Sequence, residues 1–499
     1  MSVYNSVEKV WYGSKETPAF HPDVSAGKVL EFVMKQHYPR IGLIFEPTGE
    51  QWTYEELHKT ASTIAQNILA KGLTQDDVIG ICASNTPYVT TVALAAFMTG
   101  IPISSLDPSF DKEGIQHIYG ITKPTIMFCD GKILETVTES LRGINLETSI
   151  FVVDEKRGAG TIDEFLREIG GTFECPALKY GGDHSAIYLP SSGSTGLPKA
   201  VCISHKTLIT TSFIEPTSTD TVFCFNYMLS VIEKYQVSVL ASPPSQLVLI
   251  GQSSKLGTTN VSSVRYYLLA GSAIPFHVLQ KIKEYFPNTI FSAGYGCSEL
   301  GSCCCTGEVT APNSNGHVRE NYQIKIVDED GNNLGVGETG EIVVKRPFPW
   351  LGYKGNPEAS KDTYIDGQIF MGDLGYFDEN GTLFVIDRKK DILKYKNFQY
   401  SPNEIEQVIL ELPDVVEVSV CGIPDLIATD LPAAAVVIRE GSQLTESDVY
   451  NYVAKRMVEF KHLHGGVYFV DSVPKTVSGK NLRRVVKEKL IKLYDARKQ

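Results

Sequence analysis

The sequence has no long hydrophobic run, no excess of positive charge and no pair of cysteines at Cys-x-x-Cys spacing. The longest apolar stretches are interrupted by Pro102 and by Pro243-Pro244, so we expect no transmembrane segment. The formal net charge of −12 argues against a broad nucleic-acid-binding surface, which requires a basic footprint. A local cationic site for an anionic ligand is still compatible with this charge.

The ten cysteines are scattered along the chain. Because Met1–Asn5 begins no basic-then-apolar run, we expect no signal peptide, free thiols in a reducing compartment and a cytoplasmic location. The run Cys303-Cys304-Cys305 has the residue type of a metal site. In a strand, however, Cys304 would face away from its two neighbours, and no second ligand pair follows at zinc spacing, so we expect buried thiols.

With 499 residues the chain is too long for one hydrophobic core, and two or more domains are expected. The segment Val78–Cys82 is typical of a strand, a helix is expected from about Thr86 to Gly100, and a second strand follows at Ile101–Ile103. Strand, helix and strand joined by short connections predict an α/β fold with doubly wound, mostly parallel sheets.

The segment Pro190–Val201 places glycines and hydroxyl residues just ahead of Lys199, between two apolar strands. Glycine lets backbone N–H groups converge on an anion, while the hydroxyls and the lysine add donors and positive charge. The segment therefore predicts a polyphosphate-binding loop. It is not a Walker loop, because Pro198 precedes the lysine and Ala200 follows it. A flexible Gly/Ser linker is the alternative interpretation.

The dipeptide Asn380-Gly381 lies between two apolar segments and predicts a two-residue type I′ hairpin turn. Counting outward from this turn places Asp373 opposite Arg388 on one face of the hairpin. One interpretation of this pair is a cross-strand ion pair worth about 1 kcal/mol or less. The other is a clamp for the two hydroxyls of a ribose.

These features resemble the adenylate-forming superfamily, which includes acyl-CoA synthetases, 4-coumarate–CoA ligases and beetle luciferases. Besides the phosphate loop, four motifs match the family's in order and extend the resemblance over nearly the whole chain: Gly294-Tyr295-Gly296-Cys297-Ser298-Glu299, Gly372-Asp373-Leu374-Gly375-Tyr376, Asp387-Arg388-Lys389-Lys390-Asp391 and Ser478-Gly479-Lys480. The resemblance implies an AMP-binding domain at 1–386 with a small β-rich region, a hinge at 387–390, and a smaller, mobile α+β domain at 391–499.

The resemblance also implies which residues bind the nucleotide. The phosphate-binding residues would be Ser191, Ser192, Gly193, Ser194, Thr195, Gly196 and Lys199. Adenine would lie against the turn Gly271-Ser272-Ala273, and the remaining contacts would come from Gly294, Tyr295, Gly296, Ser298, Asp373 and Arg388. The Tyr295 ring, flanked by two glycines, would stack on the base, and the Asp373–Arg388 pair would hold the ribose.

Four further roles follow from the resemblance. Glu299 would hold Mg²⁺ through oxygen, and Lys480 would be the catalytic lysine. Lys390 would be the hinge about which the small domain swings, and Lys394 would assist the second, thioester-forming half-reaction. The implied cofactors are ATP, Mg²⁺ and coenzyme A, and the implied partner is a small-molecule carboxylic acid. The oligomeric state cannot be deduced from the sequence.

The sequence departs from the family pattern after the predicted strand Thr221–Phe225. In the family this strand is followed by a His- and aromatic-bearing loop that lines the carboxylate pocket, then by a helix and a strand, whereas here Leu229–Tyr235 follows almost directly. Losing a strand and its helix would expose apolar surface at about 25 cal/mol per Å², against a net stability of about 5–15 kcal/mol. We therefore expect a shortened variant with impaired or absent activity.

Two smaller departures concern thiolation and location. Asn397 replaces the family's usual glycine beside the pantetheine path, which makes adenylation a firmer expectation than thiolation. The resemblance implies the peroxisome as the alternative to a cytoplasmic location, although the tail Asp495–Gln499 differs from the Ser-Lys-Leu peroxisomal signal of many relatives.

The sequence leaves three functions open. The first is an acyl-CoA ligase for fatty or aryl acids, which is the leading hypothesis because ligases outnumber luciferases in the family. The second is a luciferase-like monooxygenase that makes the same adenylate and oxidises it. The third is a shortened, non-catalytic family member.

Overall fold

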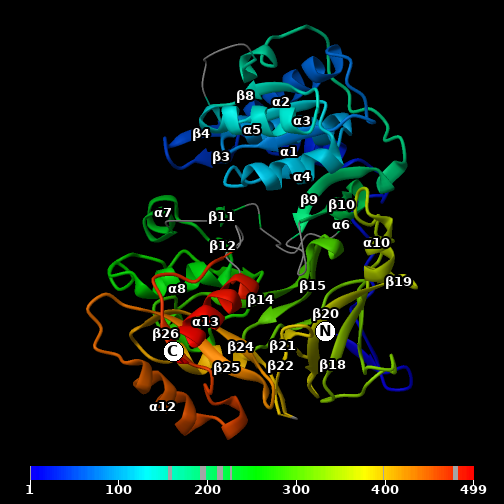
Figure 1. Cartoon of the computed structure of the whole chain (residues 1–499). Helices are drawn as coiled ribbons and strands as arrows, with labels where there is room; N and C mark the ends of the chain where they lie inside the picture. Colours follow the sequence, from blue (N-terminus) through cyan, green and yellow to red (C-terminus); the bar gives the residue numbers. More distant parts are fainter. Residues whose placement is uncertain are drawn as a thin grey trace.

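The computed structural model describes residues 2–154, 160–191, 198–210, 217, 219–224, 228–396, 398–475 and 481–498. In these ranges the chain forms four sheets of five to seven strands and a two-stranded sheet (Figure 1). The arrangement is the predicted α/β architecture with parallel sheets and a separate C-terminal sheet.

The first six-stranded sheet belongs to the N-terminal part of the chain and has the strand order β10-β9-β6-β5-β7-β8. Five neighbouring strands are parallel, and only β10 pairs antiparallel, with β9. The doubly wound arrangement predicted from the sequence is therefore confirmed. The bounds are β5 (Ile79–Cys82), α3 (Pro87–Thr99), β6 (Ile103–Leu106), α4 (Lys112–Thr122), β7 (Ile126–Cys129), α5 (Leu134–Gly143), β8 (Ser149–Val152), β9 (Ser185–Ser191) and β10 (Lys199–Ser204).

The second six-stranded sheet has the order β11-β12-β13-β14-β15-β16, and its first four strands are parallel. Helices α7 to α9 connect these strands, in the green part of Figure 1. The bounds are β11 (Val222–Cys224), α7 (Met228–Tyr235), β12 (Val239–Ser242), α8 (Pro244–Gln252), β13 (Tyr266–Ala270), α9 (Phe276–Lys283), β14 (Ile290–Cys297), β15 (Ser302–Glu308) and β16 (His317–Val318).

The predicted β-rich region is a seven-stranded sheet with the order β1-β2-β17-β18-β20-β19, in which β21 also pairs with β20. It brings the first residues of the chain beside segments more than 300 residues away, because β2 pairs with β17. The bounds are β1 (Val3–Asn5), β2 (Val10–Tyr12), β17 (Gln323–Val327), β18 (Gly340–Lys345), α10 (Pro357–Thr363), β19 (Tyr364–Ile365), β20 (Gln368–Phe377) and β21 (Leu383–Arg388).

A five-stranded sheet lies wholly within the predicted C-terminal domain and has the order β23-β22-β25-β24, with β26 pairing to β25. Helix α11 begins with proline in its first turn, as predicted. The bounds are β22 (Leu393–Tyr395), β23 (Phe398–Tyr400), α11 (Pro402–Ile409), β24 (Val415–Asp425), β25 (Thr429–Ile438), α12 (Glu446–Arg456), β26 (Gly466–Phe469) and α13 (Arg483–Lys498). The elements outside the four large sheets are α1 (Ala26–Gln36), β3 (Ile41–Phe45), β4 (Glu50–Thr53), α2 (Tyr54–Ala70) and α6 (His205–Thr210).

The tip of the β20–β21 hairpin is not the predicted two-residue type I′ turn. Gly381 donates its N–H to the carbonyl of Asp378 at 3.0 Å and has a φ of +76°. A type I′ turn also requires a positive φ at the preceding residue, and Asn380 does not have one. The tip is therefore a three-residue turn, Glu379–Gly381, that ends on a left-handed glycine.

This longer turn shifts the register of the hairpin, and a β-bulge then restores it. Next to the turn Phe377 pairs with Leu383, one residue away from the counted register. The strands change register between Leu374 and Gly375, and beyond that point Asp373 pairs with Arg388. The predicted pair is thus confirmed, although the turn from which it was counted was wrong.

The shortened segment between β11 and β12 does not leave the exposed sheet face that we expected from the sequence. Helix α7 covers the sheet here: Leu229, Val231 and Ile232 are buried in one cluster with residues of β12, α8 and α9. At the sheet edge Val222 is 43% exposed. The direct connection therefore buries apolar side chains of its own, which replaces part of the burial that a longer segment would provide.

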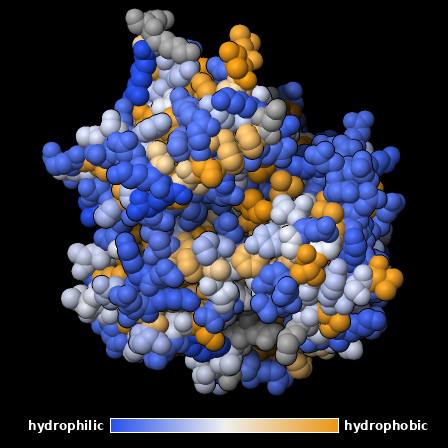
Figure 2. Space-filling model, turned by 90° about the horizontal axis from the view of Figure 1, so that it is seen from below, coloured by the Kyte–Doolittle hydropathy of each residue, from blue (hydrophilic) through white to orange (hydrophobic). Residues whose placement is uncertain are grey.

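The molecular surface is mostly polar on the face seen from below in Figure 2, where hydrophobic residues are scattered between hydrophilic ones. Within the described ranges, none of the helices combines the length and the hydropathy needed to cross a membrane.

Candidate active site

The predicted phosphate loop connects two paired strands. Ser191 ends β9, Lys199 begins β10, and the two residues are register partners in this antiparallel pair. Beside the loop, the ring Nε2 of His117 lies 2.9 Å from the carbonyl of Pro198. Five predicted phosphate-binding residues lie outside the described residues: Ser192, Gly193, Ser194, Thr195 and Gly196.

The two residues predicted to form a ribose clamp contact each other within a side-chain network, and their role toward ribose stays a prediction. Arg388 Nε lies 2.9 Å from Oδ1 of Asp373, and the Tyr295 hydroxyl donates to Oδ2 of the same carboxylate at 2.7 Å. Asp373 is 6% exposed, whereas the side chain of Arg388 is 44% exposed. The buried Tyr295 therefore holds the Asp373 carboxylate, and the Arg388 guanidinium is partly exposed to solvent.

Electrostatics keep both partners of Asp373 as donors. Burial, and then the charge of Asp373, raise the pKa of Tyr295 well above its usual value, so its hydroxyl stays protonated at neutral pH. Burial opposes the charge on Arg388, yet the neighbouring Asp373 raises the pKa of the guanidinium overall. The hydrogen bond from Tyr295 was not predicted from the sequence, and the stacking of its ring on adenine stays a prediction.

The predicted adenine turn lies at the same sheet edge as Tyr295. Strand β13 pairs with β14 so that Ala270 is opposite Gly294, and the turn Gly271-Ser272-Ala273 follows directly at the carboxyl end of β13. Ligands of parallel α/β sheets bind at such strand ends. Gly271 has a φ of +103°, a conformation that favours glycine.

Gly294 and Gly296 on β14 allow a close contact with the neighbouring strand β15. A Cβ atom added to Gly296 would lie 2.3 Å from the carbonyl oxygen of Ser302. One added to Gly294 would lie 2.8 Å from the Cys303 sulfur. Packing between β14 and β15 therefore accounts for both glycines without a ligand, and Ser298 begins the short 3-10 helix that follows.

Glu299 and Lys199 contact the same tyrosine, which the sequence analysis did not single out. The Tyr353 hydroxyl donates to Oε1 of Glu299 at 2.6 Å, and the Lys199 ammonium lies 4.6 Å from the centroid of the Tyr353 ring. Burial, and then the charge of Glu299, raise the pKa of Tyr353, so the hydroxyl remains the donor. The two predicted phosphate-end residues are thus brought together through a third side chain.

Arg346 is a second residue of this site that sequence reasoning missed. It is 5% exposed, and its guanidinium donates to the backbone carbonyl of Glu299 at 2.8 Å and to Oγ1 of Thr207 at 2.6 Å. A buried arginine on backbone oxygen fixes the path of the chain at Glu299. Neither Arg346 nor Tyr353 belongs to a spacing pattern, so the sequence alone offered no signal beyond their residue types.

The predicted hinge carries contacts between the hairpin and helix α11. Asp387 accepts from the Ser401 hydroxyl at 2.5 Å and from the Asn403 N–H at 3.2 Å, at the start of α11. Beyond the hinge residue Lys390, Lys394 is exposed on β22, and its N–H donates to Asp430 at 3.1 Å. Lys480 and Asn397 lie outside the described residues, so the structure does not place the predicted catalytic lysine.

Two other features of the sequence are structural. Cys303, Cys304 and Cys305 are all buried on β15, as expected for thiols packed in a core. His205 is fully buried at the start of α6, where its Nδ1 accepts the N–H of Ala26 at 3.1 Å, and burial lowers its pKa to about 3.

Comparison with known proteins agrees with this geometry. The model of the AMP-binding enzyme family matches residues 30–226 and 211–354, and the model of the AMP-binding enzyme C-terminal domain matches residues 404–480. The two matches of the first model overlap at 211–226, close to the point where the sequence departs from the family pattern.

The chain is similar to proteins of two activities. It is 29% identical to a luciferin 4-monooxygenase of Luciola mingrelica over 97% of this chain and 98% of that protein, and 27% identical to the 4-coumarate–CoA ligase CCL1 of Humulus lupulus over 92% of each. The first alignment has 541 positions, more than the 499 residues of this chain, so the relative carries residues that this chain lacks.

A solved anthranilate CoA ligase, AuaEII in complex with anthranoyl-AMP, has the same fold, with a TM-score of 0.86 at 20% identity over 96% of this chain and 99% of that chain. The family models together with the conserved architecture show that this chain belongs to the AMP-binding enzyme family, the adenylate-forming superfamily of acyl-CoA ligases and luciferases.

Proposed function

We propose that this chain activates a small-molecule carboxylic acid with ATP as an acyl-adenylate and then transfers the acyl group to coenzyme A. One observation supports the proposal: a single segment contacts both the residues proposed for the ribose and those proposed for the phosphates. Tyr295 in this segment holds Asp373 of the ribose clamp. Four residues later, Glu299 meets Tyr353 and, through its ring, Lys199.

In the proposed adenylation step a carboxylate oxygen of the substrate attacks the α-phosphorus of ATP, and pyrophosphate leaves. Negative charge develops on the phosphoryl oxygens, so the protein contributes mainly position and electrostatic stabilisation. Asp373 accepts from the ribose hydroxyls, and Arg388 donates to them. Lys199 and the N–H groups of the phosphate loop hold the pyrophosphate, and Lys480 bridges the carboxylate and the α-phosphate.

Glu299 fits the role of a Mg²⁺ ligand. Its carboxylate is partly buried and accepts from the Tyr353 hydroxyl, and within the described residues it forms no ion pair. An oxygen ligand of this kind, together with phosphate oxygens and water, is the environment that Mg²⁺ prefers. When bound, the ion would neutralise charge on the phosphates.

The second half-reaction would use the other face of the C-terminal domain. A rotation about Lys390 would withdraw Lys480 and present the exposed Lys394 on β22. The thiol of coenzyme A, after losing its proton, would then attack the acyl carbon, so that a thioester bond forms, the bond to the phosphate oxygen breaks and AMP leaves. The contacts from Asp387 to Ser401 and Asn403 bridge the hinge in the present arrangement, so this rotation has to break them.

A luciferase-like monooxygenase is the second candidate, because the similarity to luciferin 4-monooxygenase extends over nearly the whole of both chains. It would form the same adenylate and oxidise it with oxygen. A non-catalytic role is the third, favoured by the shortened segment between β11 and β12. Light emission with luciferin distinguishes the second candidate from the ligase.

The proposal is tested by incubating the purified chain with ATP, Mg²⁺ and a panel of fatty and aryl acids, and following acyl-adenylate and pyrophosphate by mass spectrometry. We expect adenylate with at least one acid, and its conversion to an acyl-CoA when coenzyme A is added. A Lys480→Ala variant provides the matched control and should lose adenylate formation. If no acid yields adenylate although the chain binds ATP, the third candidate holds and the ligase proposal is wrong.

A further inference from the structure

The residue that joins Glu299 to Lys199 comes from the loop between β18 and α10. Tyr353 is 8% exposed, and its ring packs edge-on against Trp350, with ring centroids 4.8 Å apart and planes at 89°. The Tyr353 N–H donates to Oγ of Ser360 at 2.8 Å, which ties this loop to α10. The position of Tyr353 is therefore fixed by a backbone hydrogen bond to Ser360 and by packing of its ring against Trp350.

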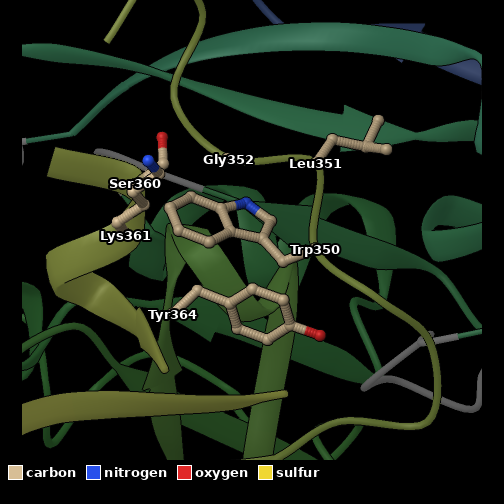
Figure 3. A pocket seen from close by; sticks show the side chains of 6 residues that line it. All are labelled: Trp350, Leu351, Gly352, Ser360, Lys361 and Tyr364. Carbon is tan, nitrogen blue, oxygen red and sulfur yellow. The ribbon is translucent and has the colours of Figure 1, made fainter. Parts of the chain in front are cut away.

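The Trp350 side chain, against which Tyr353 packs, also lines a pocket (Figure 3). The volume of this pocket is about 170 Å³. Trp350 stands between the backbone of the loop and the ring of Tyr364, with which it also makes an edge-on contact at 6.2 Å. Tyr364 is therefore a second tyrosine that packs against Trp350. Tyr353 donates a hydrogen bond to the Glu299 carboxylate, and within the described residues Tyr364 makes no such bond.

Tyr353 contacts Glu299 and Lys199 with different parts of its side chain. The hydroxyl, protonated at neutral pH, donates to Oε1 of Glu299, a charge-assisted hydrogen bond. The face of the ring lies beneath the Lys199 ammonium at 4.6 Å from the centroid, within the range of a cation–π contact. Glu299 and Lys199 have opposite charges, yet within the described residues they form no ion pair with each other.

This arrangement has a consequence for nucleotide binding. A direct ion pair between Lys199 and Glu299 would occupy the groups that have to receive a phosphate and a metal ion, and the nucleotide would have to break that pair. Tyr353 gives each charged group a partner that is weaker than a counter-ion and can be replaced or retained when ligand arrives.

We propose that Tyr353 is a positioning residue that holds the Glu299 carboxylate ready for Mg²⁺ and keeps the Lys199 ammonium apart from it, ready for the pyrophosphate of ATP. This inference rests on the proposed function. It deepens that function by assigning the coupling between the metal ligand and the phosphate-loop lysine to a residue outside the sequence motifs.

The test measures ATP affinity by calorimetry, with Mg²⁺ and with EDTA, for the wild-type chain and for Tyr353→Phe. The phenylalanine keeps the ring under Lys199 and loses the hydrogen bond to Glu299. We expect affinity for ATP with Mg²⁺ to fall about tenfold, the effect of one hydrogen bond to a charged group, and affinity in EDTA to change less than about twofold. Tyr353→Leu should weaken binding under both conditions, because it also removes the ring.

Two controls separate positioning from a general structural role. Tyr364→Phe removes a hydroxyl from the neighbouring ring, which also packs against Trp350, and should leave both affinities unchanged. In a Glu299→Gln background, Tyr353→Phe should cause little additional loss, because the two residues act through one contact. Thermal unfolding without ligand verifies that each variant is folded.

The outcomes distinguish this inference from the proposed function. If the wild-type chain binds ATP and Tyr353→Phe binds it equally well with Mg²⁺, the positioning role is wrong and the proposed function survives. Additive losses in the Glu299→Gln background would also contradict it. If folded wild-type chain binds no ATP under either condition, the proposed function fails, and the positioning role fails with it.

Discussion

Two regions of the second six-stranded sheet differ in their side-chain contacts: the region around β14 and the edge strand β11. On the side of β14, Asp373 is buried and satisfied by both Tyr295 and Arg388, and Arg346 and Tyr353 hold the segment around Glu299. At the opposite edge, the three-residue strand β11 leads almost directly into α7, and Val222 is 43% exposed. The described polar contacts are concentrated on the side of β14, and the shortened segment lies at the edge formed by β11.

We interpret this difference as a separation between the residues proposed to bind the nucleotide and the segment predicted to line the acid pocket. The resemblance implies that the loop lining the carboxylate pocket follows the strand corresponding to β11, and the sequence predicts that this chain lacks that loop. The residues proposed to bind ATP all belong to other segments. We therefore expect the shortening to affect the choice of acid, or the turnover, more than the affinity for the nucleotide.

Removing the carboxylate at the centre of the nucleotide side should have the largest effect. An Asp373→Ala variant removes the acceptor of the Tyr295 hydroxyl and the counter-ion of Arg388, which keeps its hydrogen bond to the Met371 carbonyl, and it removes the proposed acceptor for ribose. We expect ATP affinity to fall by about a hundredfold or more, and the free energy of unfolding to fall by about 2 kcal/mol, since Arg388 is half exposed.

Calorimetry and urea denaturation measure these two effects. Glu379→Ala at the exposed tip of the same hairpin is the control and should change neither quantity. If ATP affinity is unchanged in Asp373→Ala, Asp373 does not bind the ribose, and the proposed contrast between the two regions is wrong.

The second prediction concerns the helix that covers the shortened edge. Ile232 on α7 is fully buried, so Ile232→Ala should lower the free energy of unfolding by about 3 kcal/mol through lost burial and the resulting cavity. ATP affinity, measured well below the unfolding temperature, should not change, because α7 carries none of the nucleotide-binding residues.

Ser230→Ala on the exposed face of the same helix serves as the control for Ile232→Ala. A loss of stability below about 1 kcal/mol would mean that α7 does not hold the shortened edge together.

The third prediction uses pH to probe α6, which leads from β10 toward the shortened segment. Burial, and then the neighbouring His184, lower the pKa of His205 from 6.5 to about 3, so the unfolded chain binds a proton that the folded chain does not. This contribution to stability is fully present above pH 6.5 and is lost as the pH falls toward 3. His205 alone adds a slope of up to about 1.4 kcal/mol per pH unit in that window.

The matched variant is His205→Asn, whose side-chain oxygen can accept the N–H of Ala26 in place of Nδ1. Its unfolding free energy, measured by urea denaturation between pH 7 and 5, should fall less steeply than that of the wild type. Identical slopes for the two proteins would show that His205 takes up its proton in the folded state.

The smallest effect is expected at the sheet edge itself. Val222→Thr keeps a β-branched side chain on β11 at a position that is already largely in water, so the unfolding free energy should change by no more than about 0.5 kcal/mol. A loss of several kcal/mol in thermal or urea unfolding would show that another surface covers β11 in solution.

The sequence predicted those parts of the site that depend on local pattern. The parallel sheet followed from alternating strands and helices, and the pairing of Asp373 with Arg388 followed from a hairpin count. That count was correct only because a longer turn and a β-bulge between Leu374 and Gly375 compensate each other. Backbone hydrogen bonding at the tip, rather than the Asn-Gly preference, determines the turn.

Contacts between distant segments could not be predicted in this way. Tyr353 and Glu299 are 54 residues apart in the chain, and Arg346 reaches Thr207 across 139 residues. No periodicity relates such positions, because the folding of whole sheets brings them together. The cover that α7 gives to the shortened edge was missed for the same reason, since burial depends on how the helix packs and not on its length.

We propose that this chain has a nucleotide site beside a shortened acid-binding wall. Titrating the folded chain of 499 residues with ATP and Mg²⁺ in a calorimeter tests this proposal most directly. We predict saturable binding with one nucleotide per chain, weakened by about a hundredfold or more in Asp373→Ala and unchanged in Ile232→Ala. Absence of binding by folded wild-type protein at millimolar ATP would contradict the claim.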